Sequence, residues 1–355
     1  MSEQGGLPDW KVSDFDYDLP PELIAQTPLV ERDRSRLLVV DRRTNELVHS
    51  TIDRLGDWLQ PGDTLVANNS KVIAARIYAR KADTGGRVEF LLLRPQGERV
   101  WEALARPVRR LSPGTRLTVE APDADNPSHV LTVTSVGEAG SVIVDLPVGV
   151  SENLERFGQL PLPPYIKTRL ADANRYQTVY GSVPGSVAAP TAGLHFTQGL
   201  IDRLQASGLG WCEVTLHIGL DTFRPVTADL VADHVIHREW CSVGAEAKRT
   251  IFTTKQRGGR IVAIGTTAAR TLETLGRSHD AANHDGFTAM TDLFIVPGYR
   301  WSMVDAMLTN FHLPRSTLLM MISAFAGKDL IERAYREAIH HRYRFFSFGD
   351  AMLIL

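Results

Sequence analysis

Apolar and polar residues alternate with two different periods along the chain. At 197–208 and 328–341 the apolar residues recur every three or four positions, which predicts two amphipathic helices. At 212–218 every second residue is apolar, which predicts a strand with His217 on its polar face. The apolar run at 260–265 leads directly into a helical pattern, as a buried strand does before its helix. The outer parts of the chain are therefore expected to form an α/β domain.

The middle of the chain has a different pattern, because its apolar runs are short and no helical period separates them. Glycine, proline, aspartate and asparagine lie between the runs. Closely spaced short strands of this kind are typical of a small β-barrel or sandwich. We expect this β domain at 72–148, inserted into an α/β main domain made of 1–71 and 149–355. The runs that predict its strands are VEFLLL at 88–93, VWEALA at 100–105, RLTVE at 116–120, VLTVTS at 130–135 and SVIVDL at 141–146.

Length and composition narrow the class of protein. With 355 residues, 43% of them hydrophobic, the chain is long enough for two domains with substantial cores. Its 39 basic and 41 acidic residues give a net charge of −2, so contact with nucleic acid is expected only from a local basic patch. The two cysteines, Cys212 and Cys241, are too few for a disulfide framework and favour a reducing cytoplasm.

Neither a secretion signal nor a membrane span is expected. The first ten residues lack a basic segment followed by an apolar core. The longest apolar run, 318–326, is well short of the ~20 residues that a membrane helix needs. We therefore expect a soluble, cytoplasmic protein.

Polar residues follow several of the predicted strands, where α/β proteins build their sites. NNSK at 68–71 suits a small polar ligand, although asparagine and serine are also ordinary turn residues. The small residues of 186–197 lead to a predicted helix start, where backbone can approach an anion, and His195 lies just before that start. GTTAAR at 265–270 offers hydroxyl and N–H groups at another helix start, for a carboxylate or phosphate or as a simple cap.

Histidines in two further segments are candidates for proton transfer. His217 precedes a polar loop, so it is either a site residue or part of a solvated face. In HVIHREW at 234–240, a helix would bring His234 and His237 together as a metal pair, whereas a strand would bring His237 and Glu239 together as an acid–base pair. The spacing is not H-E-x-x-H, which favours the acid–base or hydrogen-bonding role over a metal.

The predicted β domain is locally basic. RPVRR at 106–110 lies near Arg94, Arg99 and Arg116. This cluster predicts either a contact with a phosphate backbone or an ordinary solvated face.

Taken together, motifs over nearly the whole chain resemble the S-adenosylmethionine:tRNA ribosyltransferase-isomerases of queuosine biosynthesis, in that family's order. The segments that carry the resemblance are DYDLPPELIAQTPLVERDRSRLLVVDR at 16–42, PGDTLVANNSKVIAARI at 61–77, LPPYIKTR at 162–169, YQTVYG at 176–181, SVAAPTAGLHFT at 186–197, TLHIGLDTFRPV at 215–226, GGRIVAIGTTAARTLE at 258–273, TNFHLPRSTLLMMISAFAG at 309–327 and YRFFSFGDAMLI at 343–354.

The resemblance implies a fold and a reaction. The fold would be an α/β/α sandwich with a small inserted β-barrel. The reaction would transfer the ribosyl moiety of S-adenosylmethionine to 7-aminomethyl-7-deazaguanine in the wobble position of a tRNA, giving epoxyqueuosine, adenine and methionine. S-adenosylmethionine would be a consumed substrate, so no cofactor is expected. The partner would be this tRNA, no membrane would be involved, and a monomer is one oligomeric state that the sequence leaves open.

The resemblance also implies which residues form the site. The proton-transfer candidates are His195, His217, His237 and His312, with Glu239 as an orienting or basic carboxylate. The binding candidates are Asn68, Asn69, Ser70, Lys71, Thr191, Gly193, Thr222, Thr266, Thr267, Thr309 and Asn310. Arg224, Arg270 and Arg315 could meet a carboxylate or phosphate of the substrate, and no metal ligand is expected.

Two residues depart from the family pattern. The family has Asn-Asp-Thr where this chain has Asn68, Asn69 and Ser70, so a carboxylate is missing. The family has glycine where Asp221 stands, which adds a charge and removes backbone freedom near His217.

These departures leave open a divergent relative with another base or another acceptor. Two further alternatives stand beside it. One is a tRNA-binding relative without activity, and the other is a metal-dependent hydrolase that uses His234, His237 and Glu239.

Overall fold

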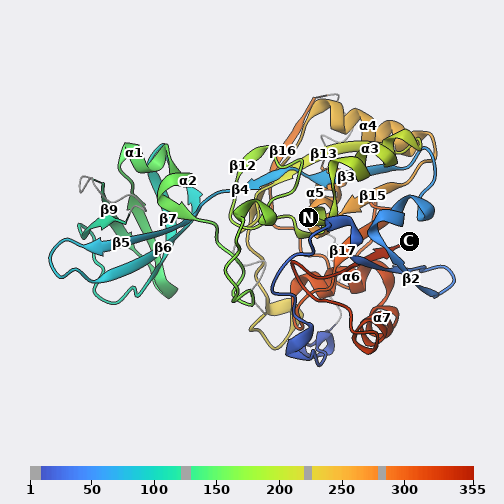
Figure 1. Cartoon of the computed structure of the whole chain (residues 1–355), viewed down its shortest axis with the longest axis horizontal. Coiled ribbons are helices and arrows are strands. Elements are labelled where there is room, and N and C mark those ends of the chain that lie inside the picture. Colours follow the sequence, from blue (N-terminus) through green and yellow to red (C-terminus); the bar gives the residue numbers. More distant parts are fainter. Residues whose placement is uncertain (1–8, 121–128, 220–225, 279–284) are drawn as a thin grey trace. The chain divides into compact units, whose positions relative to one another are not determined.

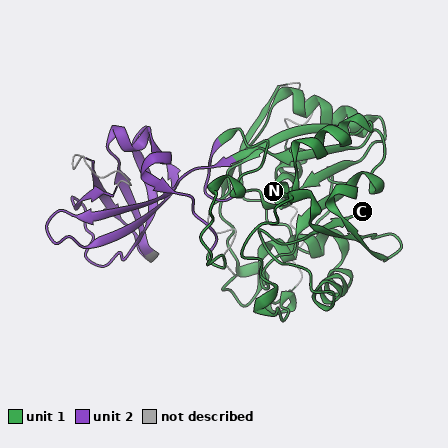
Figure 2. Cartoon of the chain, viewed as in Figure 1, with its two compact units in different colours: residues 1–70, 164–183, 189–355 green, residues 71–163, 184–188 purple. Residues whose placement is uncertain are grey.

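The protein, a computed structural model, forms two compact units, whose helices and strands are labelled in Figure 1 and which are coloured differently in Figure 2. The structure describes residues 9–120, 129–219, 226–278 and 285–355. The first unit, called here the main unit, comprises 1–70, 164–183 and 189–355. The second, called here the barrel unit, comprises 71–163 and 184–188.

A mixed β-sheet forms the centre of the main unit. Strands β13, β3, β15 and β17 run parallel to one another, so their carboxyl ends meet at one edge of the sheet. Antiparallel strands flank them, with β14 beside β13 and β18 beside β17. In order across the sheet, the described strands are β16 (Phe287–Thr291), β14 (Glu239–Val243), β13 (Gly210–Leu216), β3 (Thr64–Asn68), β15 (Ile261–Ile264), β17 (Ala306–Asn310), β18 (Ala351–Ile354), β1 (Arg36–Val40) and β2 (Leu47–Thr51).

Helices cover this sheet. Alternate residues of the central strands, such as Leu65 and Ala67, join a buried cluster with Phe196 and with Leu200 of α3. The helices α4 and α5 also contact β3, β13 and β15 but contribute no described side chain to that cluster, and they pack on the other face. The longer helices are α3 (Gln198–Ala206), α4 (Ala245–Gln256), α5 (Thr266–Gly276), α6 (Thr317–Ala326) and α7 (Lys328–His340).

Short 3-10 helices fill much of the remaining main unit. They are η1 (Val12–Phe15), η2 (Pro21–Leu23), η3 (Arg32–Arg34), η4 (Ile52–Trp58), η6 (Ala173–Tyr176), η7 (Thr191–His195) and η9 (Val231–Asp233). Of these, η7 is the one that contacts β17 and brings the 186–197 motif to the sheet.

The starts of the helices follow from local sequence. The hydroxyl of Thr197 accepts a hydrogen bond from the N–H of Leu200, which confirms the predicted cap of α3. The helix α5 starts instead from Gly265, whose φ of 89° is accessible to glycine and strained for other residues. The hydroxyls that follow Gly265 are therefore inside the first turn of α5, and neither of them is its cap.

The barrel unit confirms the predicted inserted β-barrel. Its sheet closes because β8 pairs with β5 as well as with β9. The strands around the barrel are β5 (Arg76–Lys81), β6 (Arg87–Pro95), β7 (Val100–Arg106), β10 (Ser141–Asp145), β9 (Val130–Val136) and β8 (Arg116–Val119). Side chains such as Ile77, Phe90 and Leu117 are fully buried.

The barrel unit reaches further along the chain than 72–148, because short elements after β10 fold onto it. Strand β11 pairs with β5, and at Gly158 a Cβ would lie only 1.8 Å from the carbonyl oxygen of Ala74. The additional elements of this unit are η5 (Glu138–Gly140), α1 (Val148–Ser151), α2 (Leu154–Phe157) and β11 (Gly158–Gln159). Strands β4 (Ser70–Val72) and β12 (Val183–Ser186) form a separate ribbon whose residues divide between the two units.

The segment 234–240 has neither of the two predicted conformations throughout. Residues 234–238 have no regular structure, and β14 starts at Glu239. Neither a helix that includes His234 and His237 nor a strand that includes both His237 and Glu239 is therefore formed. The reason is that β14 must start level with Thr291 of β16, its partner in the sheet.

Candidate functional site

The carboxyl edge of the parallel strands brings together residues from distant parts of the sequence. Register places Asn68 opposite Val214, and Ile264 opposite both Ala67 and Leu308. The residues that follow each strand therefore lie at one level of the same edge. Those residues are Asn68 at the end of β3, His217 after β13, Thr266 and Thr267 after β15, Thr309 and Asn310 at the end of β17, and His312 just beyond it.

His195 and Asn310 form a buried hydrogen-bonded pair at this edge. The distance between Asn310 Nδ2 and His195 Nε2 is 3.2 Å. Because the amide nitrogen can only donate, Nε2 is the acceptor and the imidazole is neutral. The same amide donates to the carbonyl of Phe346 at 3.2 Å. Its Oδ1 atom is buried and has no partner among the described residues, which leaves an acceptor for a ligand.

The backbone at Phe346 is strained where it meets Asn310. Its φ is 69°, a left-handed value that is an outlier for a bulky residue. Such strain persists only where surrounding contacts impose it, and it concentrates at functional sites. The strain thus supports placing the site beside the YRFFSFGD motif.

Burial keeps His195 neutral. It lowers the pKa of this imidazole to about 4, and the positive charges of Arg344 and Arg32 lower it further. Near pH 7 His195 therefore acts as a neutral hydrogen-bonding group.

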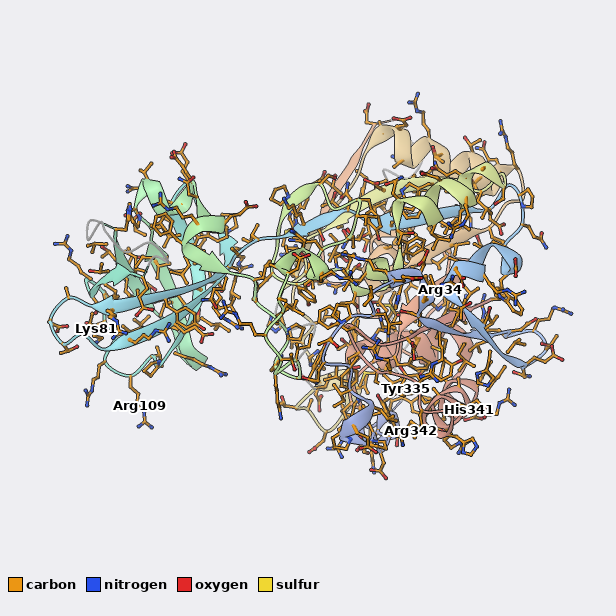
Figure 3. The ribbon with its side chains drawn as sticks, viewed as in Figure 1. Arg34, Lys81, Arg109, Tyr335, His341 and Arg342 are labelled. Atoms are coloured by element: carbon orange, nitrogen blue, oxygen red, sulfur yellow. The ribbon has the colours of Figure 1, made fainter. Side chains whose placement is uncertain are left out.

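His312 is held by three contacts. The ring atom Nε2 lies 2.8 Å from the hydroxyl of Thr309. The backbone N–H donates to Tyr335 Oη at 2.7 Å, and the hydroxyl of Tyr17 donates to the backbone carbonyl of His312. Burial lowers the pKa of His312 to about 3, so this imidazole is also neutral. Tyr335 lies on α7 (Figure 3). Neither tyrosine was among the predicted site residues, although Tyr17 belongs to the quoted DYDLPPEL motif.

The amide of Asn68 is fully used within the protein. Its Oδ1 accepts from the N–H groups of Leu216 and Ser70, and its Nδ2 donates to the carbonyl of Leu216 and the hydroxyl of Thr267. With all four positions filled, Asn68 fixes the end of β13 and the start of α5. Its position supports a role in shaping the site.

Asn69 and Ser70 have different surroundings. Asn69 donates to Glu213 at 3.2 Å and accepts from Thr215 at 2.7 Å. The hydroxyl oxygen of Ser70 is buried and has no partner in the described part of the chain. Ser70 is thus a free hydroxyl of the NNSK motif.

His217 packs on Trp240, with ring centroids 5.0 Å apart and an interplanar angle of 21°. Its backbone N–H donates to the carbonyl of Trp240 at 3.0 Å. Nδ1 is buried and unpartnered among the described residues, and burial lowers the pKa of the ring. A neutral imidazole with a free nitrogen in a half-buried place is a suitable proton acceptor.

Glu239 and Arg270 form a buried ion pair, with Glu239 Oε2 at 2.7 Å from Arg270 Nη1. The other carboxylate oxygen accepts from the N–H of Gly219 at 2.8 Å. Arg270 also donates to the carbonyls of His237 and Thr291, both at 3.2 Å. The pair therefore links α5 to the chain on either side of the site. The side chain of His237 itself is exposed.

The remaining candidates are distributed more widely. Gly193 is needed for packing, because a Cβ there would come within 2.0 Å of Tyr180 Oη. Thr191 begins η7, and Thr266 is buried in the first turn of α5. Arg315 is paired with Asp16, with 2.7 Å from Nε to Oδ2.

Three of the residues chosen from the sequence cannot be placed at this edge. Lys71 belongs to the barrel unit, where its amine is 3.8 Å from Glu155. Thr222 and Arg224, like the departure Asp221, lie outside the described residues.

The structure does not support the metal alternative at 234–240. Among the described residues, the group whose ligand atoms lie close enough for a metal consists of His49, Glu337 and His341. His234 instead packs edge-on against Phe294, with ring centroids 5.4 Å apart.

A cavity of about 610 Å³ lies at the other edge of the sheet, where Thr64 and Gly210 begin β3 and β13. Exposed arginines Arg249 and Arg257 of the α4 region line it. None of the predicted site residues does. In the described part of the chain, no helix has the length and apolar character to cross a membrane.

Comparison with known proteins agrees with this arrangement. The family described as queuosine biosynthesis protein matches residues 12–354. The chain is also similar to the solved S-adenosylmethionine tRNA ribosyltransferase of Thermotoga maritima. The two share 40% identity over 97% of this chain and 100% of that chain, with a TM-score of 0.56. The likeness confirms the α/β fold with its inserted barrel. The protein thus belongs to the queuosine biosynthesis protein family.

Proposed function

We propose that this protein is an S-adenosylmethionine:tRNA ribosyltransferase-isomerase. It transfers the ribosyl moiety of S-adenosylmethionine to 7-aminomethyl-7-deazaguanine in the wobble position of a tRNA, and it isomerises that moiety to give epoxyqueuosine. The observation that carries the proposal is the meeting of five motif segments at the carboxyl edge of β13, β3, β15 and β17. Family membership and the similarity to the Thermotoga maritima ribosyltransferase support it.

The reaction needs a base and a shielded pocket, and no external oxidant or reductant. The sulfonium acidifies C5′ of S-adenosylmethionine, a base removes that proton, and adenine leaves. The aminomethyl nitrogen of the tRNA base then attacks the ribosyl fragment. Closure of the epoxide breaks the carbon–sulfur bond and releases methionine. S-adenosylmethionine is consumed, so the reaction requires no separate cofactor.

His217 is the side chain best suited to remove the C5′ proton. It offers an unpartnered Nδ1, and its lowered pKa keeps it neutral and able to accept a proton near pH 7. His195 and His312 have pKa values of about 4 and about 3, too low for efficient base catalysis at neutral pH.

Asn310 and the two buried histidines are better suited to substrate binding. The free Oδ1 of Asn310 could accept a hydrogen bond from the adenine amino group or a ribose hydroxyl. Neutral imidazoles beside it add polar groups without adding charge. Such fixed dipoles in a buried site stabilise charge that develops during reaction.

The surroundings of Asn69 suit its amide better than they would suit the aspartate that the family has at this position. An aspartate at this position would place its carboxylate near that of Glu213, whose Oε2 is 3.2 Å from Asn69 Nδ2. Like charges at that distance repel, whereas the amide donates a hydrogen bond. The missing carboxylate is therefore compatible with a working site in this chain.

The test is an assay with S-adenosylmethionine and a tRNA that carries 7-aminomethyl-7-deazaguanine. Adenine release is followed over time, and the digested tRNA is analysed by mass spectrometry for epoxyqueuosine. The same tRNA with an unmodified wobble guanine is the control. We expect adenine and epoxyqueuosine in equal amounts with the modified tRNA only.

Two other results would reject the proposal in different ways. Tight binding of both substrates without adenine release would indicate a tRNA-binding relative without activity. Adenine release with another tRNA product, or with the control tRNA, would indicate a different acceptor.

A further inference from the structure

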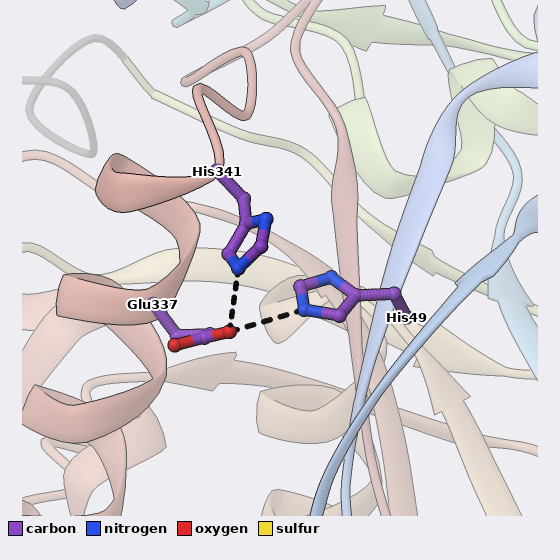
Figure 4. A group of neighbouring side chains, drawn as sticks. All are labelled: His49, Glu337 and His341. Carbon is purple, nitrogen blue, oxygen red and sulfur yellow. Dashed lines mark hydrogen bonds and ion pairs between the residues drawn. The ribbon is translucent and has the colours of Figure 1, made fainter.

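Two histidines and a glutamate form a cluster on the main unit (Figure 4). His49 lies on β2, Glu337 lies in the last turns of α7, and His341 is the C-cap residue of α7. Glu337 Oε1 lies 3.1 Å from His49 Nε2 and 3.0 Å from His341 Nε2. All three side chains are partly exposed, at 41%, 35% and 49% for His49, Glu337 and His341, so an ion can enter from solvent.

We propose that His49, Glu337 and His341 bind one divalent transition-metal ion, with zinc as the ion that suits them best. Imidazole nitrogen and carboxylate oxygen are common zinc ligands. Three protein ligands leave a fourth position for water or for a group from another molecule. The site is independent of the proposed ribosyl transfer.

The spacing of the ligand atoms fits a tetrahedral ion. Ligand atoms placed at about 2.0–2.1 Å from zinc lie roughly 3.3–3.4 Å from each other. The observed 3.0 Å and 3.1 Å are within a few tenths of an ångström of that value. The ligand atoms of the two histidines lie within 4.8 Å of each other. Side-chain rotations that bring these two atoms closer would complete the site.

A hydrogen bond orients His49 for this role. Its Nδ1 lies 2.7 Å from Tyr343 Oη, on the side of the ring away from Glu337. When Nδ1–H donates to this oxygen, the lone pair of Nε2 points toward the cluster, as in many metal sites. Tyr343 is itself held, because the guanidinium of Arg36 lies over its ring at 4.3 Å and pairs with Asp350. A built support of this kind is unnecessary for two solvated surface histidines.

Glu337 supplies the charge that balances the ion. With both histidines neutral, the three ligands carry one negative charge, and the two imidazoles each offer a lone pair. In the absence of metal, the same carboxylate bridges the two imidazole rings, which lie 4.5 Å apart. The cluster is therefore already gathered, and little conformational entropy is lost when an ion binds.

The ion would connect two elements that lie far apart in the sequence. Strand β2 is the outermost strand of the sheet, and α7 lies near the end of the chain. A bond from β2 to α7 would secure this sheet edge, because an ion that binds only the folded state stabilises it. We therefore expect saturating zinc to raise the melting temperature by about 2–4 °C.

The test uses the full chain, freed of metal with a chelator, and zinc chloride as the ligand. Isothermal titration calorimetry should give one saturable site per chain. His341→Ala and Glu337→Gln should each weaken binding at least about 100-fold, and Tyr343→Phe about 10-fold because only the orienting bond is lost. His129→Ala, which removes a histidine of the barrel unit, is the matched control and should leave the affinity unchanged.

Cobalt titration adds an independent readout. Cobalt in the proposed site should give visible bands of a tetrahedral ion and no thiolate charge-transfer band. Equal zinc affinity in the wild type and His341→Ala, or no saturable binding, would overturn the proposal. A thiolate band would also overturn it, since it would assign the ion to Cys212 or Cys241.

Discussion

At the scale of single residues, His217 combines a neutral ring with an unpartnered nitrogen at the strand edge. We predict that His217→Ala lowers the rate of adenine release by about 10²–10⁴, the usual contribution of a general base. Single-turnover adenine release with saturating substrates measures this. The affinity for S-adenosylmethionine should change much less. His340→Ala controls for loss of a histidine, and an unchanged rate in a folded His217→Ala protein would exclude the assigned role.

The buried histidines make stability depend on pH. The folded pKa of His195 is about 4 and that of His312 about 3, both below the ordinary value of 6.5. Below pH 6.5 the unfolded chain binds protons that the folded chain does not, so stability falls as pH decreases toward 4. Each histidine contributes up to about 1.4 kcal/mol per pH unit in this window.

Urea unfolding of the wild type and His195→Gln between pH 7.5 and pH 4.5 tests this dependence. The variant should lose less stability on acidification than the wild type. Identical slopes for His195→Gln and the wild type would show that His195 is protonated in the folded protein.

At the scale of elements, the ion pair between Glu239 and Arg270 joins β14 to α5. Removing one partner leaves an unpaired buried charge, so we predict that Arg270→Met lowers the free energy of unfolding by about 3–5 kcal/mol. The double variant Arg270→Met with Glu239→Gln leaves no such charge and should recover part of the loss. Urea unfolding of the wild type, the two single variants and the double variant gives the free energies of unfolding for a double-mutant cycle.

The same cycle tests whether the pair also positions the site. Glu239 accepts from the N–H of Gly219, two residues after His217. If the pair fixes this turn, the double variant should be stable yet slow in adenine release. A double variant with full activity would limit the pair to a structural role.

At the scale of the whole molecule, the barrel unit carries a group of exposed arginines. Arg94 and Arg99 are paired with Glu102 and Asp145. Among the residues that the structure describes, Arg106, Arg109, Arg110 and Arg116 have no ion pair. Arg109 points away from the barrel (Figure 3). These free guanidinium groups are compatible with both alternatives predicted from RPVRR, a phosphate contact and an ordinary solvated face.

We predict that Arg109→Glu with Arg110→Glu weakens tRNA binding about tenfold or more near 0.1 M salt, because phosphate contacts are lost. The difference should shrink as salt rises. Binding of S-adenosylmethionine should be unaffected. Fluorescence titration of labelled tRNA at several salt concentrations measures this.

The matched control is Arg249→Glu with Arg257→Glu. It makes the same change of charge on the main unit, beside the cavity at the edge opposite the candidate site. If both double variants lose equal affinity, the effect reflects net charge and the barrel has no special role.

Periodicity and motifs in the sequence were enough to predict the fold class and several of its elements, whereas the site residues chosen from the sequence stay predictions. The cap at Thr197, the helix over 328–341 and the barrel strands follow from local rules that need no distant partner. The conformation of the segment 234–240 does not follow from such local rules, because pairing between β14 and β16 decides where the strand begins. Sheet pairing links residues far apart in sequence, which local patterns do not contain.

The sequence by itself determined the α/β fold class with its inserted barrel, the positions of the polar motifs and the family resemblance, because all of these reside in residue type and order. Tertiary structure alone decided what each polar group faces. It saturated the amide of Asn68, paired Arg315 with Asp16, and left Asn310 Oδ1 and His217 Nδ1 without partners among the described residues. The physical reason is that hydrogen bonds and ion pairs depend on distances of a few ångströms. The tertiary fold sets those distances, and the register of the parallel strands is one part of it.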